Sequence, residues 1–401
     1  MKKIVSVCLI CLIILVSFVP VSATNELKLN SPYAYLFDRQ TNMVYINQKS
    51  EERIYPASMT KILTVSLALQ KIDNLQKKVT ITSIDLKGLA QMGASVAGFY
   101  EGEVVTYEDL LYGALLPSGA DACNALARLT YGSQDQFVKA MNEYVSHLGL
   151  KNTHFMNVTG LHDDQHYTTV KEMAMILNEA LKQEEFVKVF NARTHTSSQK
   201  NHTWLSSLQR GKEMKHLDIR HIDGAKSGFT DEAGVTLAST MTIHGHQCIL
   251  VTAKATGQYS QNHIKDAIMV YSYMNQHYQN LRLYKKNEDI QDYWVLKTFD
   301  GIYHYVASQD ISVLISKDIP YQDVEIKKET SFLQEAPLKQ GKQLGVIQAV
   351  YQEKILYEYP IVMEQTIESS TLAIVLHYTL LLGVPFMLIV GIICFVKKKK
   401  R

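Results

Sequence analysis

Cysteines are scarce in this sequence away from its two apolar ends. Only two of the five cysteines, Cys123 and Cys248, lie between residues 24 and 370. Two cysteines make a weak case for a disulfide framework, so we predict two buried thiols. Internal repeats and low-complexity tracts are missing as well, which argues against a repeat array.

A surplus of positive charge is also missing from this central region. The formal net charge is +2, but five cations lie at residues 397–401 and two more are Lys2 and Lys3. Without these seven residues, 34 basic side chains face 39 acidic ones, which leaves a net charge near −5. This balance argues against nucleic acid as a partner.

No metal-binding motif is evident in the chain. His162 and His166 are four residues apart, but the stretch is polar and turn-like and lacks the glutamate of an H-E-x-x-H pattern. We interpret both as loop histidines, and we expect neither a metal nor a cofactor.

The two apolar runs lie at the ends of the chain. Residues 1–23 combine two lysines, an apolar run and small residues at a cleavage position, which is typical of a secretory signal peptide. An uncleaved anchor is the alternative. Residues 372–396 are long and apolar enough to cross a bilayer, and residues 397–401 form a basic tail. We therefore predict a single-pass protein of the cell membrane, with the region between these runs on the extracytoplasmic side.

The region from residue 24 to residue 280 reads as one α+β domain. Strand patterns at 34–37 and 43–46 form a hairpin, and further strands are expected at 235–243 and 247–253. Helical patterns are expected after Pro56 and at 107–116, 120–129, 133–148, 170–182 and 261–278. Early strands, a helical middle and late strands predict a sheet that both ends of the domain complete.

Residues 281–366 have a different character. Short β-branched segments alternate with turn residues, which predicts a small all-β domain. It holds no cluster of chemically active side chains, so we interpret it as a spacer between the membrane and the first domain.

The most informative segment is residues 56–61, which read PASMTK. Ser58 and Lys61 are three residues apart at a helix start, so their side chains share one face. A serine hydroxyl is a weak nucleophile, and a neighbouring amine activates it when burial lowers the lysine pKa. A second Ser-x-x-Lys at Ser197 and Lys200 lies in a polar stretch without an apolar helix behind it, and we interpret it as a solvated loop.

Two later segments complete a pattern. Residues 115–122 (LLPSGADA) place Ser118 in a Pro/Gly turn before a helix, where a hydroxyl can pass a proton to a leaving amine. Residues 221–230 (HIDGAKSGFT) place Lys226 and Ser227 on a strand, where they can hold a substrate carboxylate. The small Gly228 lets a ligand approach the backbone there.

These three segments, in this order, resemble the signature motifs of low-molecular-mass penicillin-binding proteins, and in particular the D-alanyl-D-alanine carboxypeptidase family. Residues 110–113, 160–163 and 230–239 are similar to that family as well, and the resemblance covers roughly residues 32–273. It implies an α+β penicilloyl-serine-transferase fold, of the β-lactamase/transpeptidase-like kind, followed by the small all-β domain and a C-terminal transmembrane helix.

The resemblance also implies a covalent serine mechanism on peptidoglycan stem peptides that end in D-Ala-D-Ala. Ser58 would attack the carbonyl of the penultimate D-alanine, Lys61 would take its proton, and Ser118 would relay a proton to the departing D-alanine. The substrate-binding residues would be Lys226, Ser227, Gly228 and Phe229. Of these, Lys226 and Ser227 would hold the terminal carboxylate, and the backbone N–H groups of Ser58 and Phe229 would form the oxyanion hole. β-Lactams would acylate the same serine.

One position departs from the family pattern. The middle motif is normally Ser-x-Asn, and here its third position is Ala120. The missing amide would orient the substrate and Lys61, and such a donor is worth about 2–4 kcal/mol of barrier. Asn124 lies one helical turn further on. A catalytically weakened penicillin-binding module therefore stands as the alternative function. A β-lactamase is disfavoured because no glutamate occurs between Lys151 and Val170.

Overall fold

The computed structural model describes residues 27–257 and 260–379, together with Met387, Val390 and Ile392. The predicted signal peptide, the basic tail and most of residues 372–396 lie outside the described residues. Within the described part, no helix is both long and apolar enough to cross a membrane.

The first domain is built on a five-stranded antiparallel sheet with the order β2-β1-β9-β8-β7. Its strands are β1 (Tyr33–Asp38), β2 (Val44–Gln48), β7 (Gly224–Thr230), β8 (Gly234–Ile243) and β9 (His246–Ala255). The start of the domain therefore pairs directly with its end, with Tyr33 opposite Ala253. The predicted N-terminal hairpin and the two late strands are present.

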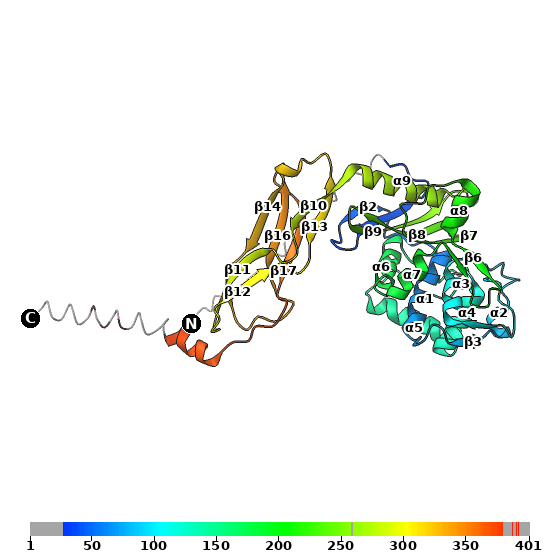
Figure 1. The fold of residues 1–401 in the computed structure, drawn as a ribbon, viewed down its shortest axis with the longest axis horizontal. Helices are drawn as coiled ribbons and strands as arrows, with labels where there is room; N and C mark the ends of the chain where they lie inside the picture. Colours follow the sequence, from blue (N-terminus) through cyan, green and yellow to red (C-terminus); the bar gives the residue numbers. More distant parts are fainter. Residues whose placement is uncertain (1–26, 258–259, 380–386, 388–389, 391, 393–401) are drawn as a thin grey trace, which may run out of the picture.

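Both faces of this sheet are covered, because its strands alternate apolar side chains between two cores. Tyr35 and Phe37 of β1 point into a large core with the central helices, whereas Ala34 and Leu36 point into a second core with the last helix. Figure 1 shows that last helix, α9 (Asn262–His277), on one side of the sheet and the helical middle on the other.

The helical middle surrounds one almost completely buried helix, α1 (Lys61–Leu69), which follows the 3-10 turn η2 (Ala57–Thr60). Around it lie α3 (Tyr107–Leu115), α4 (Ala120–Tyr131), α5 (Gln134–His147), α6 (Val170–Ala180) and α7 (Glu184–Asn191), and α2 (Ser83–Leu86) packs against α4. Helix α8 (Ser207–Lys215) lies on the α9 side of the sheet, where Leu208 joins the second core. Two small hairpins, β3 (Lys78–Thr80) with β4 (Val104–Thr106) and β5 (Thr194–Thr196) with β6 (Thr203–Leu205), complete this layer. Cys123 and Cys248 are free, buried thiols, as predicted.

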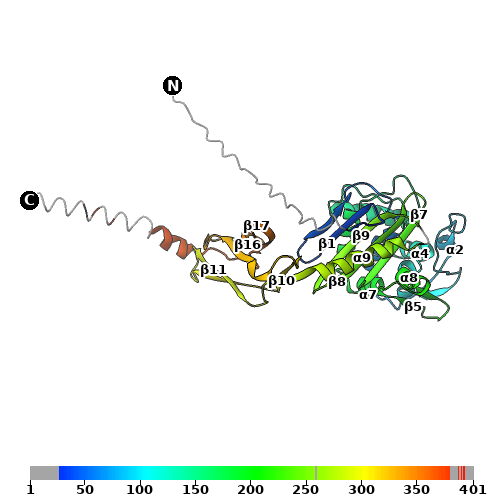
Figure 2. The same cartoon turned by 90° about the horizontal axis from the view of Figure 1, so that it is seen from above.

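The second domain is all-β, and α9 leads straight into its first strand. Its strands are β10 (Tyr278–Tyr284), β11 (Asp289–Leu296), β12 (Ile302–Val306), β13 (Ile311–Ser316), β14 (Glu325–Thr330), β15 (Leu333–Glu335), β16 (Gln343–Tyr351) and β17 (Lys354–Val362). They form three small sheets around one core that contains Tyr293, Val313 and Ile347. Figure 2 shows this domain extending from the first domain toward the C-terminal helical residues.

A few side chains connect the two domains. Tyr45 Oη donates to the carbonyl oxygen of Leu314 at 3.2 Å. His246 lies between Asp38, at 2.7 Å, and Ser312 of β13, at 3.1 Å. His246 is the first residue of β9, directly after the turn at residues 244–245, and it is buried.

Candidate active site

The candidate nucleophile, Ser58, lies on a strained turn in front of the buried helix α1. Ala57 has a positive φ of +48°, which is uncommon for a residue with a side chain. Gly160 packs against this turn so closely that an added Cβ would lie 1.9 Å from the carbonyl oxygen of Ala57. The turn holds Ser58 partly exposed while its neighbours Ala57 and Met59 are buried.

Lys61 lies directly beneath the nucleophile. Its Nζ is 2.9 Å from Ser58 Oγ, and it also donates to the carbonyl oxygen of Thr159. The Thr159 loop is fixed in turn by Asn157, whose side-chain oxygen accepts from Thr159 N at 3.1 Å and from Gly160 N at 2.7 Å. Burial lowers the pKa of Lys61, which favours the neutral amine that a general base requires.

Ser118 and Lys226 form a second pair beside the first. Ser118 has a φ of +68° in the turn between α3 and α4, and its Oγ lies 3.0 Å from Lys226 Nζ. Lys226 is only 2 % exposed and also donates to the carbonyl oxygen of Ser227 at 2.7 Å. Burial, and then the nearby positive charge of Lys61, hold the pKa of Lys226 well below its usual value. A bound carboxylate would favour the charged form again.

Strand β7 brings its backbone against the Ser58 turn. A Cβ on Gly228 would lie 2.6 Å from Ser58 N, 2.8 Å from Thr236 Oγ1 and 2.9 Å from Ala57 Cβ. Only a glycine allows this approach, which places the backbone of the next residue, Phe229, near Ser58 N. In the described sheet β7 is the last strand, so it pairs on one side with β8.

The contacts described above link Ser58 with Lys61, Ser118 with Lys226, and Gly228 with the Ser58 turn. Ser227 and Phe229 are the neighbours of Gly228 on strand β7. Ser58, Ser118 and Ser227 are partly exposed and Phe229 is exposed, whereas Lys61 and Lys226 are buried behind them. Accessible hydroxyls next to buried amines suit nucleophilic catalysis. Burial lowers the pKa values of the two lysines, and the substrate can still reach the serine hydroxyls.

Asn124 does not replace the amide that Ala120 lacks. Ala120 is buried, and its backbone N–H donates to the carbonyl oxygen of Ser95 at 2.8 Å. The side-chain nitrogen of Asn124 donates to the carbonyl oxygen of Asp85 at 3.0 Å, on the α2 side of helix α4. Among the described residues, Asn124 Oδ1 has no hydrogen-bond partner.

The second Ser-x-x-Lys lies in a turn whose residues 198–200 are exposed, as predicted, but its serine is buried. Ser197 is buried in the turn of the β5–β6 hairpin, where its N–H donates to the His202 carbonyl oxygen at 2.9 Å and its Oγ accepts from His202 N at 3.1 Å. Lys200 is exposed. These hydrogen bonds close the turn and engage the backbone N–H and the hydroxyl oxygen of Ser197. Among the described residues, no amine is hydrogen-bonded to this hydroxyl to activate it.

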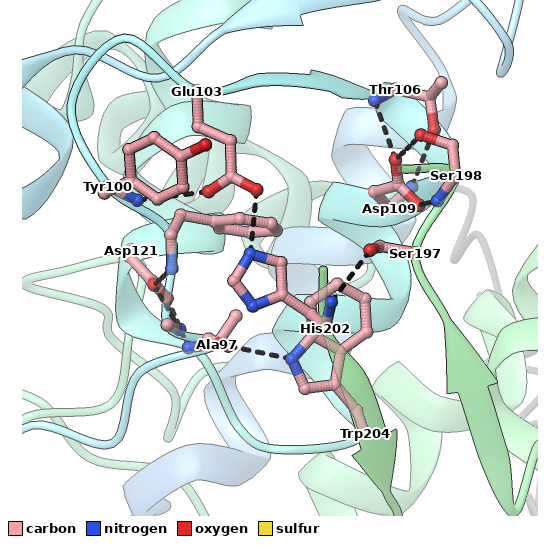
Figure 3. Close-up of polar contacts among 12 residues, drawn as sticks. Ala97, Tyr100, Glu103, Thr106, Asp109, Asp121, Ser197, Ser198, His202 and Trp204 are labelled. Atoms are coloured by element: carbon pink, nitrogen blue, oxygen red, sulfur yellow. Dashed lines mark hydrogen bonds and ion pairs between the residues drawn. The ribbon is translucent and has the colours of Figure 1, made fainter. Parts of the chain in front are cut away.

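Sequence reasoning missed a carboxylate that supports the Ser118 turn. Asp121, in the first turn of α4, accepts hydrogen bonds from Ala97 N at 2.7 Å, Gly98 N at 3.0 Å and Phe99 N at 3.1 Å. Figure 3 shows these contacts beside Trp204, whose Nε1 donates to the Ala97 carbonyl oxygen at 2.8 Å. An aspartate in the first turn of a helix was visible in the sequence, but the loop that it binds was not.

Polar pairs connect the β5–β6 hairpin to Glu103, at the end of the same loop, and to Asp109 of α3. His202 Nε2 lies 2.8 Å from Glu103 Oε1, and Ser198 Oγ donates to Asp109 Oδ2 at 2.6 Å (Figure 3). These contacts span 99 and 89 residues of sequence, so no local pattern predicts them.

His166 is a second supporting residue, and it is buried rather than exposed in a polar loop. Its Nε2 lies 2.8 Å from Thr60 Oγ1, next to Lys61, and its Nδ1 accepts from Met156 N at 3.2 Å. Burial lowers the pKa of His166 to about 4, so the ring is neutral at pH 7. Among the described residues, no group of three or more potential ligands is arranged for a metal ion.

Comparison with known proteins agrees with this geometry. The family model described as D-alanyl-D-alanine carboxypeptidase matches residues 20–257, and the model for the C-terminal domain of penicillin-binding protein 5 matches residues 278–369. The D-alanyl-D-alanine carboxypeptidase DacF of Bacillus subtilis is 30 % identical over 383 residues, which cover 92 % of this chain and 96 % of that protein. The DacA carboxypeptidase of Escherichia coli is 34 % identical over 224 residues, 52 % of each chain.

Solved structures show the same fold. Penicillin-binding protein 5 from Haemophilus influenzae has a TM-score of 0.73 at 24 % identity, covering 85 % of this chain and 99 % of that one. A mutant of the Streptomyces K15 DD-transpeptidase has a TM-score of 0.56 at 27 % identity, covering 62 % of this chain and 98 % of that one. With two family models that together match most of the chain, this protein belongs to the D-alanyl-D-alanine carboxypeptidase family.

Proposed function

We propose that this protein is a serine carboxypeptidase that removes the terminal D-alanine from peptidoglycan stem peptides through an acyl-enzyme on Ser58. The observation that carries the proposal is the contact of 2.9 Å between Ser58 Oγ and Lys61 Nζ, with a lysine pKa that burial lowers. This pair supplies a nucleophile and its base on one short helical turn.

In the first step, Ser58 Oγ attacks the carbonyl carbon of the penultimate D-alanine and Lys61 takes the hydroxyl proton. The oxyanion is stabilised by the backbone N–H groups of Ser58 and Phe229, which the approach of Gly228 brings together. When the C–N bond breaks, the amine of the departing D-alanine takes a proton from Ser118. Ser118 regains its proton from the protonated Lys61, so Lys61 is neutral again when water attacks. The contact of 3.0 Å with Lys226 Nζ orients the Ser118 hydroxyl for this relay.

The acyl-enzyme is then an ester between Ser58 and the shortened peptide. Water attacks this ester, Lys61 accepts the water proton, and Ser58 Oγ leaves with a proton. The terminal carboxylate of the substrate is held by Lys226 and Ser227 before the first step. The same geometry accommodates the acylation of Ser58 by a β-lactam, which carries a carboxylate and a reactive amide.

Two further features belong to this proposal. Residues 1–23 act as a signal peptide, and residues 372–396 act as a transmembrane helix with the basic tail in the cytoplasm. Their composition supports both roles. The active site then faces the extracytoplasmic side, where the stem peptides lie.

The test is hydrolysis of a peptide that ends in D-Ala-D-Ala, followed by D-alanine release and by mass spectrometry of the trapped acyl-enzyme. Ser58→Ala and Lys61→Ala should abolish release. The matched control is Lys200→Ala, which removes the lysine of the second Ser-x-x-Lys and should leave release unchanged. An acyl group on any other serine, or release that survives Ser58→Ala, would refute the mechanism.

The absence of an amide at Ala120 favours one second candidate, a binding module with little turnover. Such a module would form a β-lactam adduct on Ser58 but release no D-alanine. The same two measurements separate it from the enzyme.

A further inference from the structure

An unusual group of exposed apolar side chains lies on the second domain. The strand register aligns Ile302 of β12, Trp294 of β11 and Leu333 of β15 in one row across a three-stranded sheet. All three point to the same face, and they are 39 %, 57 % and 46 % exposed. Adjacent residues in a sheet row are in contact range, so this is a continuous apolar strip and not a set of scattered side chains.

Two exposed phenylalanines are close to the strip along the chain. Phe299 lies in the turn between β11 and β12, Phe332 lies just before β15, and each is 65 % exposed. The next row on the same face is polar, with Asp292 opposite His304 and their side chains 2.8 Å apart. The five apolar residues, which we call the aromatic tip, therefore occupy the end of the sheet near the β11–β12 turn.

The aromatic tip adjoins the point where the chain leaves the second domain. The backbone N–H of Ser370 donates to the carbonyl oxygen of Lys297 in the β11–β12 turn at 2.8 Å. Residues 371–379 are helical, and Lys297 Nζ lies 5.4 Å from the centre of the Tyr378 ring. Figures 1 and 2 show these helical residues next to β11 and β12, at the end of the second domain that faces away from the catalytic sheet.

The helical residues continue the apolar surface. Leu372, Val375 and Leu376 share one face of the helix by their spacing and are exposed. In the sequence, the apolar run continues to residue 396 and is followed by five cations. The strip and the helix thus bring exposed apolar surface to the same end of the molecule, where the proposed transmembrane segment begins.

We propose that the aromatic tip inserts into the interfacial layer of the lipid bilayer, so that the second domain contacts the membrane with Trp294, Phe299 and Phe332. Aromatic side chains are enriched at this depth of membranes, and tryptophan prefers it because its ring is apolar and its N–H is polar. The proposal rests on the membrane placement proposed above and adds a second contact to it. Contacts from both the helix and the tip hold the domain at a fixed tilt, with the catalytic domain at its far end.

The chain offers a direct test because it has two tryptophans, one in each domain. Trp294 is in the aromatic tip, and Trp204 is buried beside the active site. The full chain is reconstituted into phosphatidylglycerol–phosphatidylethanolamine vesicles that contain brominated lipids, which quench tryptophan fluorescence only at contact depth. In a Trp204→Phe variant, the remaining Trp294 emission should be strongly quenched, and more by bromine near the headgroup end of the acyl chain than by bromine at its centre.

The matched control is Trp294→Phe, whose remaining Trp204 should not be quenched. If Trp204→Phe folds poorly, the difference between the wild-type chain and Trp294→Phe gives the Trp294 signal. Replacing Phe299 and Phe332 with serine should reduce the quenching of Trp294, whereas Met214→Ser, an exposed apolar residue of the catalytic domain, should not.

Three outcomes distinguish membrane contact by the aromatic tip from anchoring by the proposed transmembrane segment. A chain that does not float with the vesicles refutes both the transmembrane segment and the tip. A chain that floats while Trp294 stays unquenched and open to aqueous acrylamide refutes the tip alone. Trp294 that is shielded from acrylamide but not quenched by bromolipid would mean that a second copy covers the strip, and this also refutes the proposal.

Discussion

The close approach of Gly228 to the Ser58 turn makes Gly228→Ala the most informative substitution. The added methyl would lie 2.6 Å from Ser58 N and 2.9 Å from Ala57 Cβ. Non-bonded heavy atoms are best separated by about 3.5–4.0 Å, so strand β7 and the turn must move apart by on the order of 1 Å. The two N–H groups of the proposed oxyanion hole, those of Ser58 and Phe229, belong to the two segments that separate.

The magnitude follows from this displacement. A misplacement of about 1 Å costs roughly 100-fold in rate, which corresponds to about 2.7 kcal/mol of barrier. Overpacking itself costs about 1–3 kcal/mol of folding free energy. We therefore expect Gly228→Ala to slow acylation of the protein by a fluorescent penicillin about 100-fold in stopped-flow or gel assays, with a modest fall in the melting temperature.

Gly224→Ala is the control on the same strand. Its added Cβ would lie 2.3 Å from Asn191 Oδ1 and 2.5 Å from Phe190 Cδ1, so it presses on α7 and not on Ser58. It should lower the melting temperature at least as much as Gly228→Ala while the folded protein acylates at nearly the wild-type rate. Equal acylation defects in the two variants, or none in Gly228→Ala, would show that the approach of β7 does not set the oxyanion hole.

Three further predictions concern Ala120, Lys61 and His166. Ala120→Asn should raise the rate of D-alanine release from the peptide about tenfold or more if the restored hydrogen-bond donor lowers the barrier by over 1.4 kcal/mol. An unchanged rate would mean that the amide is not needed here. Burial lowers the pKa of Lys61, so the acylation rate should rise with pH, and this rise should occur below the ordinary lysine pKa of 10.5. A rate that does not change with pH in stopped-flow measurements would exclude Lys61 as the base. The pKa of His166 is lowered from 6.5 to about 4, so this residue binds its proton more weakly in the folded chain than in the unfolded chain. It therefore contributes on the order of 3 kcal/mol to the free energy of unfolding above pH 6.5, and this contribution is lost as the pH falls toward 4. Urea unfolding of wild type and His166→Gln across this range should show a steeper acid loss in the wild type.

Local sequence patterns predicted the elements that carry the catalytic pairs. Helix α1 and the Ser118 turn follow from apolar spacing and from a Pro/Gly turn, and both lie where expected. Several short elements were missed, namely helices α2, α7 and α8 and the β3–β4 and β5–β6 hairpins. Helix α7 has only eight residues, and the β5–β6 hairpin has three-residue strands in a polar stretch, so neither contains enough periodicity to be recognised. The predicted last helix extended through Tyr278, but that residue pairs with Ser316 and begins β10.

The supporting residues of the site depend on contacts that sequence cannot give. Asp121 binds backbone groups more than 20 residues away, and His166 meets Thr60 across 106 residues. The burial of Lys226 and the positive φ of Ser118 likewise come from packing and not from their neighbours in sequence. Residue types at short spacing predicted the candidate catalytic side chains, whereas tertiary contacts decide their protonation and orientation.

The pairing of β1 with β9 has a consequence for how the protein reaches its folded state. These strands lie next to each other in the sheet although about 220 residues separate Tyr33 from Ala253. Closing a loop of that length costs on the order of 5 kcal/mol of chain entropy, which is regained only after the strands pair. High contact order of this kind makes folding slow. A chain emerging residue by residue therefore cannot complete its sheet until β9 has been made, so the sheet of the first domain forms late.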